Sequence, residues 1–259
     1  MQAEVLYIVI NLPRAESRRL AMQQQLEQLG LSMCIAPAVA GADLSPDSPT
    51  GYDAATRARY FTNDLLPNEI ACAMSHRNAL KIFLDSKADY AVIMEDDAVL
   101  APNFNEGIRE LIEHIHGWEA AKLFTDDGKL YPLEPHCEGA EVQAVFPKKL
   151  PWVAVGYLYT RSAAEKVYTG LSRFWLPADA QIGQTLLRMR IPTIGVTPGL
   201  IHSGDPDNTQ STLDATGSRR ARQPKRSLLS YIAYRAFVIS TALAKRRMRK
   251  LMSRRLSRR

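Results

Sequence analysis

Three consecutive carboxylates follow an apolar segment, and they are the residues of this sequence best suited to chemistry. The segment Ala91–Met94 predicts a buried strand, and Glu95, Asp96 and Asp97 come directly after it. Adjacent carboxylates repel one another unless a cation or hydrogen-bond donors compensate their charge. Oxygen ligands of this kind suit Mg²⁺ or Mn²⁺, and Mg²⁺ commonly bridges to substrate phosphates. The triplet therefore indicates a metal–phosphate site, with a solvated loop that caps a helix as the alternative.

A second group of polar residues shares one face of a predicted helix. The segment Pro67–Ser86 predicts this helix, with Asn68 as its N-cap. Glu69, Cys72 and His76 follow at spacings of three and four residues, which place them on the same side. The HExxH pattern is absent, so the spacing does not indicate a zinc site. A structural role in the core is the alternative for His76.

Two single residues complete the candidates from spacing alone. Gly156 lies inside a strand predicted over Trp152–Tyr159, which indicates close approach by another backbone or a ligand, or packing alone. Asp179 precedes a helix predicted over Ala180–Arg190. There it either caps the helix or points into a cleft.

The scaffold that would position these residues is an α/β domain. Strands and helices alternate along the chain, which predicts a mostly parallel central sheet with helices on both faces. Ligands of such sheets bind beyond the carboxyl ends of the strands, where the acidic triplet is expected. Further strands are predicted at Val5–Ile10, Cys34–Val39, Ala120–Phe124, Glu141–Val145 and Ile194–Thr197, the last of which is expected to be the final strand. Further helices are predicted at Arg18–Leu29, Phe104–Ile115 and Ser162–Tyr168, with Ser162 as the cap of the third. Loops are predicted at Gly41–Tyr60 and Ser203–Thr216.

Charge divides the chain of 259 residues into two parts. The formal net charge is +6, but 15 of the 33 basic residues and none of the 27 acidic ones lie in residues 219–259. The remainder therefore carries a net charge of −9. We predict an acidic body over residues 1–218 and a basic tail over residues 219–259. The composition, 46% hydrophobic and 23% charged, is that of a globular protein and excludes a disordered or collagenous one.

Cysteine use and the amino terminus bear on the compartment. Cys34, Cys72 and Cys137 are odd in number and widely spaced, which argues against a disulfide framework and favours a reducing compartment. The apolar run Val5–Ile10 is too short for a secretory signal. We therefore expect a cytoplasmic protein.

Five motifs in order resemble glycosyltransferase family 25, the lipooligosaccharide β-galactosyltransferase type. They are INLPRAESRR, NEIACAMSH, VIMEDDAVL, VGYLYTRSAAEKV and PADAQI, and the resemblance covers about residues 5–215. It implies a GT-A fold, a nucleotide-sugar donor such as UDP-galactose, and transfer with inversion at the anomeric carbon. It also implies a divalent cation, Mn²⁺ or Mg²⁺, on the donor diphosphate.

The resemblance also implies roles for individual residues. Asp96 and Asp97 would hold the cation, and Glu95 would face the nucleotide. Asn11 and its loop would lie against the nucleotide, with Arg14 or Arg18 paired to phosphate or left as surface charges. Glu69, Ser75 and His76 match the helical motif, and Gly156 matches the glycine strand; these join the donor-binding candidates.

The catalytic base and one further ligand are chosen from fewer signals. Inversion requires a carboxylate within reach of the acceptor hydroxyl. Asp179 matches the family's acid after the glycine strand, and Asp126 and Asp127 are alternatives. For His202, three roles are open: a further metal ligand, a contact with phosphate, or a structural residue. The loop Ser203–Gly217 departs from the family pattern, although Ser211 matches a serine there.

The basic tail predicts contact with an anionic membrane surface. Residues 227–244 are apolar apart from Arg235 and a few hydroxyl residues, and at 18 residues they are short for a span. In residues 245–259, Met248, Leu251, Met252 and Leu256 recur at helical spacing among basic residues, which predicts an amphipathic helix on the inner face of the membrane. A nucleic-acid-binding or solvated tail and a true span are the alternatives.

The lead hypothesis is an inverting glycosyltransferase that is peripheral to the membrane and has a lipid-linked saccharide acceptor. One competing class is a basic-tailed nucleic-acid-binding or scaffold protein, which the acidic body disfavours because it would repel nucleic acid. The other is a glycoside hydrolase that uses two carboxylates. A hydrolase would release free sugar without a nucleotide donor.

Overall fold

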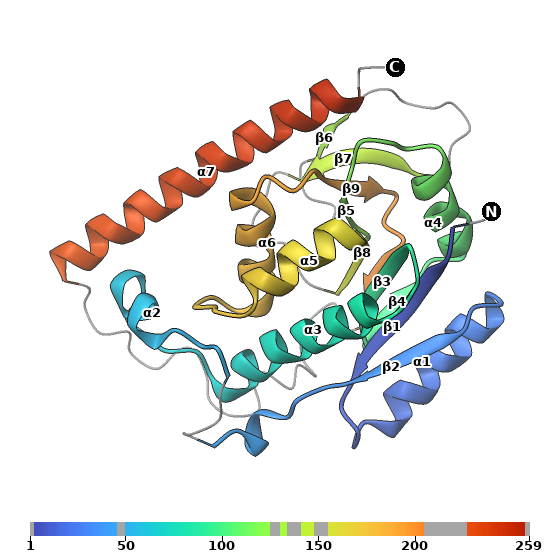
Figure 1. Ribbon diagram of the computed structural model, residues 1–259, viewed down its shortest axis with the longest axis horizontal. Helices are drawn as coiled ribbons and strands as arrows, with labels where there is room; N and C mark the ends of the chain where they lie inside the picture. Colours follow the sequence, from blue (N-terminus) through green and yellow to red (C-terminus); the bar gives the residue numbers. More distant parts are fainter. Residues whose placement is uncertain are drawn as a thin grey trace.

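An eight-stranded sheet forms the centre of the computed structural model, which describes residues 3–45, 50–124, 130–133, 141–147, 155–204 and 227–256 (Figure 1). The strand order in the described chain is β2-β1-β3-β8-β5-β9-β7-β6. The strands are β1 (Val5–Asn11), β2 (Met33–Pro37), β3 (Tyr90–Glu95), β5 (Ala120–Lys122), β6 (Leu130–Pro132), β7 (Gln143–Pro147), β8 (Gly156–Thr160) and β9 (Thr193–Thr197).

Most strands of this sheet point in one direction. β1 is parallel to β2 and β3, and β5 is parallel to β9, whereas β8 is antiparallel to both β3 and β5. β7 is antiparallel to β9 and to β6, so that among the described strands only β8 and β7 are reversed. The prediction of a mostly parallel α/β sheet is confirmed in this sense, and the reversed β8 lies next to the end of β3 that carries the acidic triplet.

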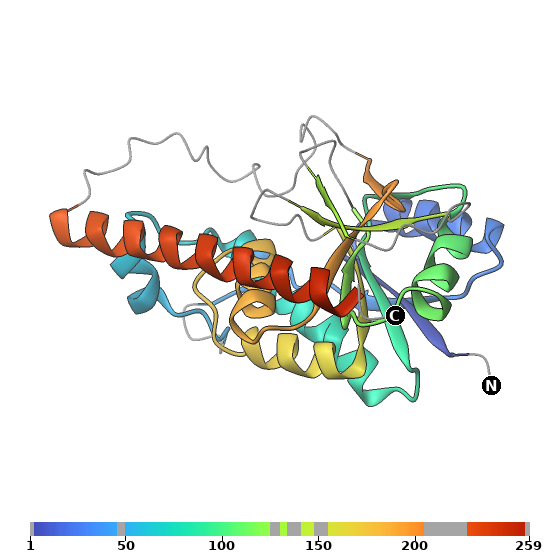
Figure 2. The ribbon, with the colours of Figure 1, turned by 90° about the horizontal axis from the view of Figure 1, so that it is seen from above.

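Helices cover both faces of the sheet, as predicted. Figure 2 shows α1 and α4 on one side and α3, α5 and α6 on the other. Tyr7 of β1 contacts Phe104 of α4 at 6.1 Å between ring centroids, and both are buried in the common core. The helices are α1 (Glu16–Gln28), α2 (Ala54–Tyr60), α3 (Pro67–Asp85), α4 (Phe104–Glu113), α5 (Arg161–Gly170), α6 (Ala178–Arg188) and α7 (Leu228–Leu256).

Three helix N-caps differ from the sequence-based expectation. The N-cap of α3 is Leu66, so Asn68 lies inside the helix after Pro67. α5 is capped by Thr160, whose hydroxyl accepts from the Ala163 amide, because β8 runs directly into the helix without a loop. α6 begins at Ala178 with Pro177 as N-cap, so Asp179 lies in its first turn. α3 thus starts at Pro67 as predicted, whereas α5 and α6, as well as α1, start one or two residues earlier than predicted.

Two segments predicted as loop or chain end carry further structure. The segment Gly41–Tyr60 contains a 3₁₀ turn, η1 (Gly41–Asp43), and α2, which Asp53 caps by accepting from the Thr56 amide. β9 is not the last strand, since β10 (Ile201–Ser203) follows it and pairs with β4 (Ala98–Leu100). The short ribbon of β4 and β10 begins at the acidic triplet.

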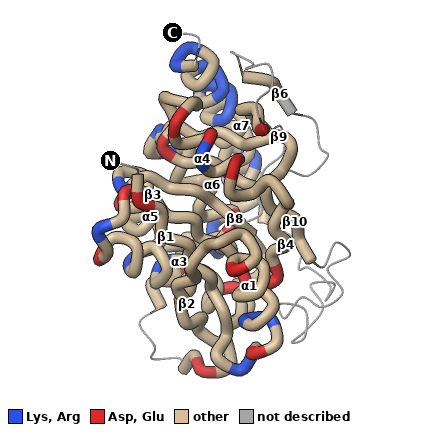
Figure 3. The backbone as a smooth tube through the Cα atoms, turned by 90° about the vertical axis from the view of Figure 1, so that its right-hand side faces the viewer, with Lys and Arg blue, Asp and Glu red and all other residues tan. Residues whose placement is uncertain are grey.

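The carboxyl-terminal helix α7 packs on the body along its length. Figure 3 shows Lys and Arg gathered near its carboxyl-terminal end. Near its start, Phe237 lies 5.1 Å from Trp175 between ring centroids, and near its end, Met248, Met252 and Leu256 belong to the core. The predicted helix is present over most of residues 245–259, and Met248, Met252 and Leu256 of its predicted apolar face pack against the body, so that contact with a membrane stays a prediction. None of the described helices has the length and apolarity of a membrane span.

Candidate functional site

The acidic triplet lies at the carboxyl end of β3, where the sheet directs three successive side chains into three different surroundings. β3 is continuous with the core through Val92–Met94, all buried. The Glu95 amide donates to Val155 O at 3.1 Å, which ties this end of β3 to the start of β8. The Gly204 amide donates to Asp97 O at 2.8 Å, which holds the other end of the triplet against β10. The backbone of the triplet is therefore fixed on both sides.

Glu95 faces helix α3. Its Oε1 lies 3.1 Å from Nε2 of the buried His76. The Sγ of Cys72, one turn earlier on α3, completes a group of three possible ligand atoms within 4.8 Å of one another, and no other such trio occurs in the described chain. Burial raises the pKa of the Cys72 thiol well above its usual value, and the charges of Glu95 and Asp179 add to the shift. The thiol is therefore held neutral beside a hydrogen-bonded His76–Glu95 pair.

Asp96 faces the loop that follows β1. Its Oδ2 accepts from Asn11 Nδ2 at 2.7 Å, and its Oδ1 lies 3.3 Å from the Arg18 guanidinium. The same Asn11 amide donates to Ala15 O at 3.1 Å, which shapes the turn before α1. The structure thus brings Asn11 and Arg18, predicted on the donor side, together with Asp96, predicted as a metal ligand; the contact of each with donor or cation stays a prediction. Arg14 is exposed on the same loop.

Asp97 is the carboxylate of the triplet whose charge is compensated only in part, by the nearby charge of Arg18 and a backbone hydrogen bond. Its Oδ1 is buried and has no hydrogen-bond partner. Burial raises the pKa of Asp97 to about 6, and the negative charges of Glu95 and Asp96 push in the same direction. A buried, partnerless oxygen costs free energy, so it marks a place where a ligand is expected to bind.

Tyr157 and Asp179 add a second side to the site. Tyr157 on β8 pairs with Ile93 of β3, and its hydroxyl is buried without a partner. Burial raises the pKa of Tyr157, with the charge of Asp179 as a lesser cause. Asp179, at the start of α6, accepts from the Ala180 amide at 2.7 Å through Oδ1. Asp179 therefore lies within electrostatic reach of both Tyr157 and Cys72.

Glu69 and Ser75 make structural hydrogen bonds on α3. Glu69 Oε2 accepts from the Leu66 amide at 2.9 Å at the start of the helix. Ser75 Oγ donates to Ala71 O and accepts from the Val39 amide, which joins α3 to the chain after β2. Both residues hold the helix that presents His76, and a direct contact of either with a donor remains a prediction.

The close approach predicted at Gly156 is made by a side chain. A Cβ added to Gly156 would lie 2.3 Å from Ile201 Cδ1. Packing against β10 therefore explains the glycine, and its contact with a donor also remains a prediction.

His202 is exposed on β10, opposite Val99 in the ribbon next to the triplet. The alternative bases Asp126 and Asp127, as well as Ser211, lie outside the described residues. Cys72 and Tyr157 were not among the predicted site residues. The spacing of Cys72 between Glu69 and His76 was a usable signal, whereas Tyr157 within an apolar strand gave none.

Fold and site together define an α/β protein whose candidate ligand site lies at the carboxyl edge of a mostly parallel sheet, beside a partly buried carboxylate. Residues 5–182 match the family described as Glycosyltransferase family 25 (LPS biosynthesis protein). A protein of Aedes aegypti named Glycosyltransferase 25 family member is 26% identical over 174 residues, which cover 61% of this chain and 27% of that protein. The chain belongs to glycosyltransferase family 25.

The match leaves most of the Aedes aegypti protein uncovered, since the chain spans about a quarter of its length. The family match ends inside α6, just after Asp179. Every acidic residue of the described site lies within the matched range, whereas β9, β10 and α7 lie beyond it.

Proposed function

We propose that this protein is an inverting glycosyltransferase with a GT-A-like nucleotide-sugar-binding domain. It transfers a hexose, with galactose as the first candidate, from a UDP-sugar to a saccharide of lipooligosaccharide or lipopolysaccharide. The observation that carries this proposal is the buried Oδ1 of Asp97, which has no hydrogen-bond partner, just beyond the carboxyl end of β3 in a chain of glycosyltransferase family 25. Family membership favours transfer over the hydrolase and the scaffold alternatives.

The donor set at Asp97 fits a divalent cation. Mg²⁺ and Mn²⁺ prefer carboxylate oxygens, and the partnerless Oδ1 of Asp97 is such an oxygen. Asp97 is the first ligand in this proposal, with Asp96 and His202 as the further candidates from neighbouring positions. When bound, the cation would neutralise the charge of the departing nucleoside diphosphate. Asn11 and Arg18 orient Asp96 from the nucleotide side, and His76 orients Glu95.

Asp179 is the proposed general base. It takes the proton from the acceptor hydroxyl while the hydroxyl oxygen attacks the anomeric carbon and the bond to the diphosphate breaks. Attack from the face opposite the leaving group inverts the anomeric configuration. The influence of Asp179 on the pKa of both Cys72 and Tyr157 supports its position at the same site as Glu95 and Asp97.

The proposed place of action is the cytoplasmic face of the cell membrane, with a lipid-linked saccharide as acceptor. Cys34 and Cys72 are free thiols, which fits a reducing compartment. The 15 basic residues of 219–259, with no acidic residue among them, favour an anionic surface as partner.

A donor screen tests this function. Thermal unfolding is measured with a panel of nucleotide sugars, each with and without Mn²⁺. A donor at a hundredfold excess over its Kd stabilises the protein by about 2.7 kcal/mol. We expect this shift with a UDP-hexose and Mn²⁺ together and a smaller one with either alone.

Two outcomes of the screen and its follow-up would contradict the proposal. One is the absence of stabilisation by every nucleotide sugar in the panel. The other is release of free sugar from a glycoside in the absence of any nucleotide donor, which would instead identify a hydrolase.

A further inference from the structure

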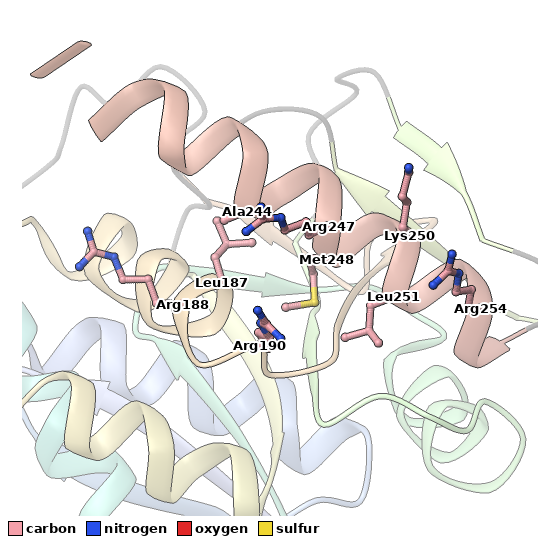
Figure 4. Close-up of a pocket in the computed structure, with 9 residues that line it drawn as sticks. All are labelled: Leu187, Arg188, Arg190, Ala244, Arg247, Met248, Lys250, Leu251 and Arg254. Carbon is pink, nitrogen blue, oxygen red and sulfur yellow. The ribbon is translucent and has the colours of Figure 1, made fainter. Parts of the chain in front are cut away.

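A cationic pocket of about 480 Å³ lies between the end of α6 and the second half of α7 (Figure 4). Its floor is apolar and includes Leu187, Met248 and Leu251. Its rim carries five cations and no acidic residue: Arg188, Arg190, Arg247, Lys250 and Arg254. Two of the cations come from α6 and the turn after it, and three come from α7. The pocket thus combines a positive rim with an apolar base.

The five cations gather without local compensation. Within the part of the chain that the structure describes, none of them forms an ion pair with a carboxylate. Like charges that surround one cavity repel one another, so an anion bound there would relieve the repulsion.

The backbone that carries Arg190 adds a further cost. Arg190 has a φ of 52°, and it ends α6 in a turn in which the Ile191 amide donates to Leu186 O at 2.9 Å. This helix-ending position usually holds glycine, because other residues are strained in the left-handed region. The helix-ending turn requires this left-handed conformation, and it holds Arg190 in the lining of the cationic pocket.

An exposed apolar stripe continues from the pocket along the outer face of α7. Leu228, Ile232, Ile239 and Leu243 follow one another at spacings of four and seven residues, and each is 50–74% exposed. The same spacing continues into Lys250 and Arg254. Apart from the exposed Arg235, the outer face of α7 is therefore apolar over its first half, and it is cationic over its second, on the side opposite Met248 and Met252 in the core.

We propose that the pocket binds the phosphate headgroup of an anionic phospholipid while the stripe on α7 enters the membrane interface. The five cations select the charge, and the apolar floor accepts the uncharged part of the lipid next to the phosphate. Nucleic acid fits this surface less well, because exposed aliphatic side chains provide no stacking platform for bases. This inference rests on the proposed function in one respect: a lipid-linked acceptor lies in a membrane, so the enzyme must act there.

The pocket is separate from the candidate catalytic site. Asp179 and Arg188 lie at opposite ends of α6, nine residues apart, which corresponds to about 14 Å along the helix axis. Binding of lipid can therefore be measured without donor, cation or acceptor, and its failure would leave the donor screen unaffected.

The first experiment tests the pocket with the full chain. Sedimentation is measured with vesicles of phosphatidylcholine alone and with vesicles in which about a third of the lipid is phosphatidylglycerol. The pocket variant is Arg188→Gln with Arg190→Asn, since asparagine tolerates the left-handed region. The control removes two exposed cations elsewhere, Lys87→Gln with Arg109→Gln. We expect the pocket variant to bind the anionic vesicles about 30-fold more weakly and the control to bind nearly as the parent does.

The second experiment tests the stripe. Ile239→Asn with Leu243→Asn is compared with Leu20→Asn, whose parent residue is equally exposed (53%) on α1. We expect at least tenfold weaker binding to anionic vesicles for the α7 variant and no change for Leu20→Asn, with thermal unfolding of both variants close to that of the parent. If the pocket variant and its control lose vesicle binding equally, the assignment of the pocket is wrong. If the α7 variant binds anionic vesicles as the parent does, the role of the stripe is wrong. Preference of the parent for duplex DNA over the anionic vesicles at equal phosphate would overturn both.

Discussion

Three adjacent acidic residues at the end of one strand have three different electrostatic environments. Glu95 is paired with His76, Asp96 with Asn11 and Arg18, and Asp97 with no side chain that reaches its buried Oδ1. Glu95 ends β3, whereas Asp96 and Asp97 lie in the turn before β4, so the three side chains leave the backbone in different directions. Asp97, whose Oδ1 lacks a partner, is the residue proposed to act on the donor.

Asp97→Asn is expected to abolish transfer and to stabilise the protein in the absence of metal. The variant keeps the shape of the side chain but removes a buried negative charge whose pKa is raised to about 6. At pH 7 that charge costs at most about 3 kcal/mol, which the variant recovers, while transfer falls at least about 100-fold. Thermal unfolding and a UDP-release assay measure the two effects.

Asp96→Asn is the matched control for that variant. It removes a charge that Arg18 compensates, so it should destabilise the protein and not stabilise it. Equal stability changes in the two variants would show that the two carboxylates do not differ as described.

Asp179→Asn is expected to lower kcat without weakening donor binding. An amide cannot accept the proton of the acceptor hydroxyl, and loss of a general base typically costs 10²–10⁴-fold, about 3–5 kcal/mol in the barrier. Single-turnover kinetics give kcat, and the donor-induced thermal shift gives binding. If Asp127→Asn loses activity in its place, Asp127 is the base.

At the scale of elements, one arginine of α5 holds the end of α3. The guanidinium of Arg161 donates to four carbonyl oxygens at or just beyond the end of that helix, at 2.7–3.4 Å: those of Phe83, Leu84, Ser86 and Ala88. Helix ends leave such carbonyls without partners, and a planar group with several donors can satisfy them together. α3 is thereby fixed where it presents Cys72 and His76.

Arg161→Met is expected to lower the free energy of unfolding by about 2–4 kcal/mol, because it leaves several partly buried carbonyls without donors. Arg161→Lys should recover only part of the loss, since an ammonium group cannot reach all four oxygens. Urea denaturation of the three proteins measures both changes. Full recovery by lysine would mean that charge alone, and not the fork of donors, holds the helix end.

The contact between β8 and β10 gives a second prediction at this scale. Gly156→Ala should destabilise the protein by about 1–3 kcal/mol, because the new methyl group would meet Ile201 Cδ1 at 2.3 Å. Ile201→Val removes that one atom, so the double variant should regain most of the stability. Additive losses in the double variant, measured by urea denaturation, would contradict the packing explanation.

At the scale of the whole molecule, the basic carboxyl-terminal segment is built into the body. α7 packs on α2 through Tyr60, Phe61 and Phe237, and on the core through Met248 and Met252. Lys245 lies within this contact, and burial lowers the pKa of Lys245 to about 8, with the nearby charge of Lys122 as the second cause. The packing of α7 on the body therefore disfavours the charged form of Lys245.

Lys245→Met is expected to raise the melting temperature at pH 7. The gain in the free energy of unfolding should be no more than about 2 kcal/mol, because solvent screens a half-buried group. In the parent, Lys245 is charged in both folded and unfolded states below pH 8. Between pH 8 and about 10.5 only the unfolded state holds the proton, so parent stability from this group rises with pH. Melting temperatures at pH 7 and pH 10 measure this: the gap between parent and variant should close, and a constant gap would contradict the assignment.

Local signals were sufficient for most of the fold. Continuous apolar runs such as Val5–Ile10 and Ala91–Met94 became central strands because both of their faces are covered by helices. The acidic triplet was placed correctly because it follows such a strand directly. The signals failed at α2 and β10, where a short helix and a three-residue strand depend on contacts with α7 and β4 and carry little pattern of their own.

The sequence by itself determined the α/β class, the family motifs and the residues that could act as acids, bases and ligands, since these follow from residue type and from spacing along the chain. Only the tertiary structure decided which of these residues meet. It paired Asp96 with Arg18, left the buried Oδ1 of Asp97 without a hydrogen-bond partner, and turned Met248 and Met252 toward the core. A helix with two apolar faces has no preferred side until another surface is present. The body supplied that surface, and it left the stripe from Leu228 to Leu243 exposed.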